Sequence, residues 1–143
     1  MEKPIIEHSS TYKNYKYVVL FFPMGHRCGY VQVPFWHKLY EKDYEDFYNI
    51  KCHGGLTYSS HRLLDKTYPG WWIGFDCAHA GDLVDIVSCE KYFGNIDKVE
   101  RQRVEYLTSL YENTEMTKTA TVKNLDFCVA ECKNIIDQLV EME

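Results

Sequence analysis

The sequence lacks the features that define several large classes of protein. It has no apolar run long enough to span a bilayer, because the longest, YVVLFFPM, falls far short of the about 20 residues required. It has no dense cluster of Lys or Arg, and a net charge of −5 argues against general nucleic-acid binding. The amino terminus, MEKPIIEHSS, shows no basic segment followed by an apolar stretch. We therefore expect a soluble, cytoplasmic protein that binds neither membranes nor nucleic acid in general.

Signatures of metal and nucleotide chemistry are absent as well. The sequence contains neither GxxxxGK[ST] nor GxGxxG, and its six cysteines form no CxxC pair. Because the spacings of Cys, His and Asp match no common zinc pattern, we expect no metal and no cofactor. Without a secretion signal, the cysteines are expected to be reduced thiols packed in the core. Zinc held by Cys28, Cys52 and Cys77 stays open as the alternative.

What the chain does have is one domain's length and many aromatic rings. At 143 residues it can bury a core without disulfides or metals, so we expect a single domain over 1–143. Aromatic residues make up 15% of the chain, which is high for a globular protein. Rings give large contact area with few rotatable bonds, so the excess suits both a core and a ring-lined ligand site.

Residue patterns in the first two thirds predict mainly strands. Residues 15–22 and 26–33 are β-branched and aromatic, and Pro23-Met24-Gly25 between them indicates a hairpin. Two more strands are predicted, at 56–59, where side chains alternate, and at 71–79. A polar loop at 60–70 is expected between them. Gly74 within the second of these strands indicates close approach of another group to the backbone.

Helical spacing dominates the last third. Residues 121–141 place apolar side chains at i, i+3, i+4 and i+7 throughout, which predicts an amphipathic helix. Weaker helical spacing is found at 41–48 and at 96–111, and residues 112–121 are expected to form a loop. The expected fold class is α+β: a mainly antiparallel sheet with the C-terminal amphipathic helix packed on one face.

Reactive side chains gather in three segments that contain glycine. The segments are 26–29, 52–55 and 76–82, and each lies at or near the end of an expected strand. If the sheet brings these ends together, they enclose a pocket with polar groups on its rim and rings on its walls. Glycine amides and an arginine suit an anion, and the rings suit a base. The candidate ligand-binding residues are His26, Arg27, Tyr30, His53, Gly54, Gly55, Tyr58, Trp72, Asp76, His79 and Asp82.

Other interpretations of the same residues stay open. Asp76, His79 and His53 suit general acid and base catalysis, and they are the candidate catalytic residues if the protein is an enzyme. Cys77 and His79 would share a face if the strand continued through them, as a nucleophile and its base require. The structural alternative is that the aspartates cap a turn and that one of the tryptophans Trp71 and Trp72 belongs to the core.

Four stretches of the chain resemble a family of small, functionally uncharacterised proteins of bacteriophages and prophages. They are GHRCGYV at 25–31, KLY with DYEDF within 38–47, HGGLTYS at 53–59 and GFDCAHAGD at 74–82. The chain departs from the family pattern at His37, which Trp36 and Lys38 flank. The resemblance implies a phage protein made in the host cytosol, and it implies no reaction. Small phage proteins of this kind often inhibit bacterial defence. An inhibitory role for this chain would follow from that association and not from the residues themselves.

We therefore expect a phage-derived, counter-defence protein that sequesters a small anionic ligand derived from a nucleotide. The motivating features are aromatic residues interleaved with Gly, Arg and His, and the lack of a metal or nucleophile pattern. A binding protein is favoured over an enzyme. The alternatives are a small hydrolase acting on such a ligand, and a protein-binding inhibitor of a bacterial defence effector such as a CRISPR protein. Further candidate partners are a second copy of this chain, in a homo-oligomer, and a host defence protein.

Overall fold

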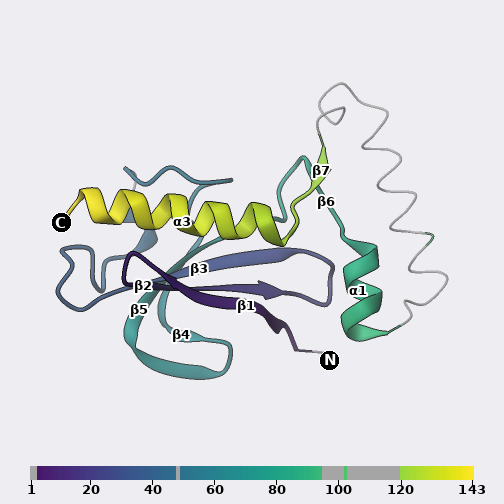
Figure 1. Ribbon diagram of the computed structural model, residues 1–143, viewed down its shortest axis with the longest axis horizontal. Coiled ribbons are helices and arrows are strands. Elements are labelled where there is room, and N and C mark those ends of the chain that lie inside the picture. Colours follow the sequence, from purple (N-terminus) through teal and green to yellow (C-terminus); the bar gives the residue numbers. More distant parts are fainter. Residues whose placement is uncertain (1–2, 48, 95–101, 103–119) are drawn as a thin grey trace.

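The computed structural model describes residues 3–47, 49–94, 102 and 120–143, and its centre is a five-stranded antiparallel sheet (Figure 1). The expected α+β class, with the C-terminal helix packed on the sheet, is confirmed. In the described part of the chain, no helix is long and apolar enough to cross a membrane. The strand order is β1 (Ile5–Tyr12), β2 (Tyr15–Phe21), β3 (Arg27–Val33), β5 (Lys66–Asp76) and β4 (Tyr58–Leu63).

The C-terminal helix α3 (Leu125–Glu141) covers one face of the sheet, crossing β2 and β3 (Figure 1). It begins later than the expected 121–141, because the side chain of Asn124 accepts a hydrogen bond from Phe127 N and caps it. Thr121–Val122 form β7 instead, which pairs in parallel with β6 (Asp82–Leu83). The helix buries one apolar stripe against the sheet: Cys128, Cys132, Ile135, Ile136 and Leu139.

The opposite face of the sheet carries a second, smaller core. Trp72 is fully buried there, whereas its neighbour Trp71 packs against the α3-side core, as alternation along a strand requires. The hairpin of β4 and β5 supplies part of the cover, through Leu63 and Tyr68. The buried members of this cluster are Val18, Leu20, Cys28, Tyr30, Leu63 and Trp72.

Two local predictions from the sequence are wrong. The expected helix at 41–48 is only a 3-10 turn, η1 (Tyr44–Asp46), because Glu41 has a left-handed backbone with φ of 60° and Asp43 caps the turn from an extended conformation. The expected polar loop at 60–70 is mostly strand: β4 and β5 continue into a tight hairpin that turns at Leu64, where φ is 57°.

Four elements of the structure were not expected from the sequence. They are the edge strand β1, the short helix α1 (Ile86–Phe93), whose first turn is capped by Asp85, and the two-residue strands β6 and β7. The expected hairpin of 15–22 and 26–33 is confirmed as β2 and β3. Apart from residue 102, the expected helix at 96–111 lies outside the described residues, as does all but the end of the loop at 112–121.

Candidate functional site

Several of the candidate site residues meet at one open pocket at the end of the sheet. Its volume is about 510 Å³, and it is lined by side chains from three separate parts of the chain. His26 comes from the β2–β3 turn, Tyr58 from β4, and His79 from the loop that follows β5. The lining residues are Phe22, His26, Cys28, Tyr30, Thr57, Tyr58, Phe75, Asp76, Ala78 and His79, and this set is called the strand-end pocket below.

Strand register explains why two tyrosines face the same side of this pocket. Tyr30 on β3 and Tyr58 on β4 both pair with Gly74 on the strand between them. The two rings lie edge to face with centroids 5.3 Å apart. A Cβ on Gly74 would lie 2.5 Å from Cδ1 of Tyr30, so the group that approaches the glycine backbone is this ring. Gly74 therefore lets the aromatic wall of the pocket form across the sheet.

Asp76 and His79 form the polar wall of the pocket. Asp76 Oδ2 accepts a hydrogen bond from Thr57 Oγ1 at 3.0 Å, and Oδ1 accepts one from Ala78 N at 3.1 Å. The Nδ1 atom of His79 lies 3.3 Å from Asp76 Oδ1 but makes no hydrogen bond of acceptable geometry. The carboxylate is thus fixed by neighbours, and it stands beside an imidazole nitrogen that has no directed partner.

Asp82 connects this wall to His53. Its side chain is only 1% exposed, and its Oδ2 lies 2.9 Å from His53 Nε2 and accepts a hydrogen bond from His79 N at 3.0 Å. Because an ionised carboxylate only accepts, His53 carries its proton on Nε2. The rings of His53 and His79 lie edge to face with centroids 5.9 Å apart. His53, His79 and Asp82 therefore form one cluster, which shares His79 with the strand-end pocket.

Two residues complete this cluster, one just before α3 and one in its first turn. Lys123 Nζ lies 3.2 Å from Asp82 Oδ1, and the ring of Phe127 meets that of His53 edge to face at 5.2 Å between centroids. No sequence pattern selects them, because they lie more than forty residues from Asp82, and a lysine or aromatic residue at the start of a helix is common. Only the docking of α3 on the sheet brings them to the site.

The electrostatics of the site differ from one group to the next. Burial lowers the pKa of His26, and the charges of Asp76 and Asp82 offset this only in part, so His26 is neutral at pH 7. Burial of Asp82 favours its neutral form, but hydrogen bonds from His53, from His79 N and from Lys123 outweigh this and hold its pKa below the usual value. At neutral pH the site thus combines a neutral imidazole with a fixed negative charge.

Arg27 does not reach the pocket, although it follows His26 in the chain. Its guanidinium is 4% exposed and forms ion pairs with Glu7, at 2.6 Å, and with Asp85, at 2.9 Å. It also donates to Ser88 Oγ and stacks over the ring of Phe21. Adjacent residues of a strand point to opposite faces, which directs Arg27 away from the ligand-facing side. The arginine links β1, β3 and α1, so no donor is left for an anion.

Trp72 and the two loop glycines also lie apart from the strand-end pocket. Trp72 is fully buried in the second core, so its ring does not line the cavity. Gly54, with φ of 66°, supports the ring of His79, because a Cβ there would lie 2.4 Å from His79 Cε1. Gly55 lines a different pocket of about 480 Å³, between the loop at 50–56 and η1.

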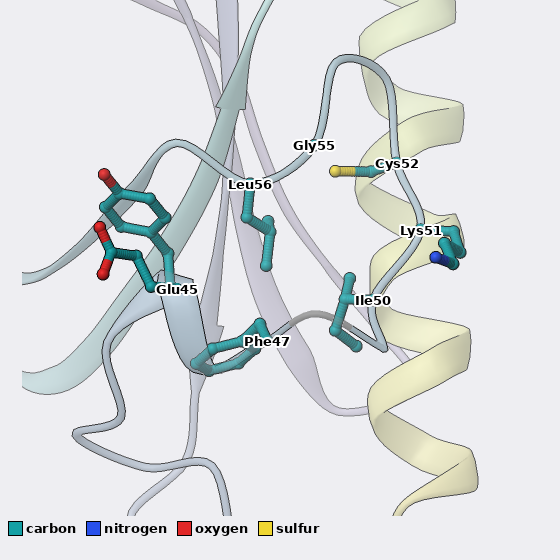
Figure 2. A pocket seen from close by; sticks show the side chains of 8 residues that line it. Glu45, Phe47, Ile50, Lys51, Cys52, Gly55 and Leu56 are labelled. Carbon is teal, nitrogen blue, oxygen red and sulfur yellow. The ribbon is translucent and has the colours of Figure 1, made fainter.

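Figure 2 shows this second pocket beside α3, with Phe47, Ile50 and Leu56 turned toward one another. Burial raises the pKa of the Cys52 thiol in its wall to about 12. The side chain of Lys51 lies on the helix side, away from these apolar residues. The second pocket therefore combines these apolar residues with Tyr44, Glu45, Lys51 and Cys52, and no histidine is among its described lining residues. The imidazoles of His26 and His79 beside the carboxylate of Asp76 favour the strand-end pocket as the candidate site.

The cysteines do not have the surroundings of a nucleophile. Strand β5 ends at Asp76, so Cys77 turns into the α3-side core, and its Sγ lies 3.6 Å from Cys128 Sγ. The contact with Cys128, together with burial, raises the pKa of Cys77. Burial also raises the pKa of Cys28, in the strand-end pocket, to about 12. Both groups are protonated thiols at pH 7, which disfavours nucleophilic catalysis by Cys77 with His79.

Comparison of the chain with protein-family models, with curated proteins and with solved structures gives no match.

Proposed function

We propose that this protein binds a small nucleotide-derived molecule in the strand-end pocket and holds it without chemical change. The observation that carries the proposal is the convergence of His26, Tyr58 and His79, from three distant segments, on one cavity of about 510 Å³. A cavity of this size suits a small ligand, and rings with a few fixed polar groups are typical of such sites.

The lining favours the base of the ligand over its phosphate. The pocket offers π faces and edges from Phe22, Tyr30 and Tyr58, on which a planar base can stack. Asp76 offers carboxylate oxygens to the N–H groups of a base edge. No Lys or Arg is among the described residues that line the pocket, and Arg27 is held by Glu7 and Asp85. A phosphate group would therefore contact the histidines or remain in solvent at the mouth of the pocket.

Calorimetry against nucleosides, mononucleotides, cyclic dinucleotides and ADP-ribose derivatives tests this proposal. We expect at least one to bind with a Kd below about 1 mM, which corresponds to about 4 kcal/mol. Tyr58→Ala should weaken that binding at least tenfold. Tyr68→Ala is the matched control, because Tyr68 packs on the same face of the sheet without lining the pocket. Failure of the whole panel to bind, or equal effects of the two variants, would contradict the proposal.

A second candidate function is hydrolysis of the same ligand, and the carboxylate beside each imidazole favours it. Asp82 accepts from His53, and Asp76 lies 3.3 Å from His79, as in sites where a carboxylate orients a general base. Chromatography after incubation separates the two functions, because a sequestering protein returns its ligand intact on denaturation. If product forms, Asp76→Asn should lower its rate at least tenfold. The counter-defence role rests on the resemblance alone and stays a prediction.

A further inference from the structure

We propose that His53, His79 and Asp82 form a binding site for a divalent transition-metal ion such as Zn²⁺. One ligand-type atom from each of the three residues lies within 4.8 Å of the other two. Two imidazole nitrogens and one carboxylate oxygen are a donor set that zinc takes in proteins, with a fourth position left open. No sequence spacing predicts this site, because His53 and Asp82 lie 29 residues apart in the chain.

The two distances from Asp82 to the imidazole nitrogens are close to those that a tetrahedral ion requires. Bonds of about 2.0–2.2 Å to nitrogen and oxygen place neighbouring ligand atoms about 3.3–3.5 Å apart. Asp82 Oδ2 lies 2.9 Å from His53 Nε2 and 3.7 Å from His79 Nδ1, on either side of that value. Small rotations of the two rings therefore suffice to bind an ion, which would take the place of the Nε2 proton of His53.

The hydrogen bonding of the cluster is incomplete, which points to a missing partner. His79 Nδ1 is buried and makes no hydrogen bond of acceptable geometry, whereas Asp82 Oδ1 lies 3.2 Å from Lys123 Nζ. His79 Nδ1 faces two carboxylates, Asp76 at 3.3 Å and Asp82 at 3.7 Å. A buried polar atom without a partner is costly, and a cation among two imidazoles and two carboxylates would remove that cost.

The surrounding residues hold the three ligands in place. Asp82 and His79 close a turn through Asp82 N donating to His79 O, at 2.9 Å. His53 N donates to Glu131 on α3 at 2.8 Å, and the ring of His79 rests on the bare Cα of Gly54. Lys123 approaches Asp82 through Oδ1, whereas Oδ2 accepts a hydrogen bond from His79 N and lies closest to both imidazole rings. Such outer contacts fix the orientation of metal ligands.

Titration of the chelator-treated, reduced full chain with Co²⁺ and then Zn²⁺ tests the site in the absence of any organic ligand. Co²⁺ should give the intense visible d–d bands of a four- or five-coordinate ion at one equivalent, and Zn²⁺ should displace it. Thiolate-to-cobalt charge-transfer bands should be absent, because the site contains no cysteine. A chromophoric chelator in competition should report a Zn²⁺ Kd of about 1 μM or tighter.

Variants assign the ion to these residues. His53→Gln and Asp82→Asn should each weaken Zn²⁺ binding at least 100-fold, whereas His61→Gln should leave it unchanged. His61 is the control because it lies on β4 and bonds Gly70 O. If Asp82→Asn unfolds, as circular dichroism would reveal, His53→Gln decides alone. A Kd above about 100 μM, thiolate bands, or unchanged affinity in His53→Gln would overturn the proposal. Because no nucleotide is present, this result is independent of the proposed function.

Discussion

At the scale of single residues, the site depends on a histidine that stays neutral. His26 is half-buried in the wall of the strand-end pocket, and this burial lowers its pKa below the ordinary 6.5. A neutral imidazole can both donate and accept a hydrogen bond, which suits recognition of a base edge. The neighbouring carboxylates of Asp76 and Asp82 act in the opposite direction, but they are weaker than the effect of burial.

This state of His26 can be measured by NMR titration of its ring protons. We expect a midpoint below 6.5, and Asp76→Asn should lower it further because one favourable charge is lost. The unfolded chain binds the proton near 6.5 and the folded chain only at lower pH. The free energy of unfolding should therefore fall as the pH drops through the interval between these values. His26→Gln should reduce that slope, and a midpoint above 6.5 would contradict the assignment.

Two neighbouring glycines provide a matched test of where the ring of His79 lies. Gly54 and Gly55 both have left-handed backbones, so Ala at either position costs about 1–2 kcal/mol of stability. Only at Gly54 would the new Cβ also meet the ring of His79, at 2.4 Å, whereas Gly55 faces open space. Urea unfolding should therefore show Gly54→Ala to be the less stable variant. Equal losses would place the ring of His79 elsewhere.

At the scale of elements, the buried arginine links parts of the fold that are distant in sequence. Arg27 on β3 pairs with Glu7 on β1 and with Asp85, the residue that caps α1. Tyr92 on α1 donates to the same glutamate at 2.6 Å. Figure 1 shows α1 beside the end of the β2–β3 hairpin, where these contacts form. The network therefore positions α1 against the sheet.

Removal of this arginine should be strongly destabilising. Arg27→Ala leaves Glu7 and Asp85 without their partner in a buried position, so we expect a loss of about 3–5 kcal/mol. Arg62→Ala, in the exposed part of β4, should change the stability by less than about 0.5 kcal/mol. Chemical denaturation of both variants gives the comparison. A loss below about 1 kcal/mol for Arg27→Ala would mean that the ion pairs contribute little.

The sequence predicted the elements whose burial pattern is regular. The apolar stripe of 125–141 and the β2–β3 hairpin follow simple periods, so both were found. β1 was missed because most of its residues are only partly buried or exposed, which leaves no alternation to detect. The helix expected at 41–48 failed because the backbone at Glu41 is left-handed and Phe47 is buried at the end of a 3-10 turn.

The candidate site was predictable only in part, because its residues follow no regular period along the chain. Polar residues beside glycine, such as His79 and Asp82, indicate a loop that takes part in binding or catalysis besides connecting two elements. The direction of a side chain depends on strand register, which the sequence did not supply for Arg27 or Trp72. Lys123 joins the site only through the packing of α3. Residue type thus indicated the chemistry, and topology decided which residues take part.

At the scale of the whole molecule, the cysteines behave as parts of the core. The structure describes all of them as free, and only Cys52 is partly accessible. Burial raises the pKa of both Cys28 and Cys52 to about 12. Iodoacetamide at pH 7 should therefore label the native chain far more slowly than the urea-unfolded chain, in which all six should react. Rapid labelling of one native cysteine, located by mass spectrometry, would instead identify a reactive thiol.

The arrangement of the whole molecule also brings segments that are distant in sequence together in one site. The most direct measurement is a NOESY spectrum of the native chain with labelled His and Phe rings. We expect cross-peaks from the ring of His53 to those of His79 and Phe127, whose centroids lie 5.9 and 5.2 Å away. If His53 instead shows contacts only with its neighbours in sequence, these segments do not converge, and the proposed metal site of His53, His79 and Asp82 does not exist.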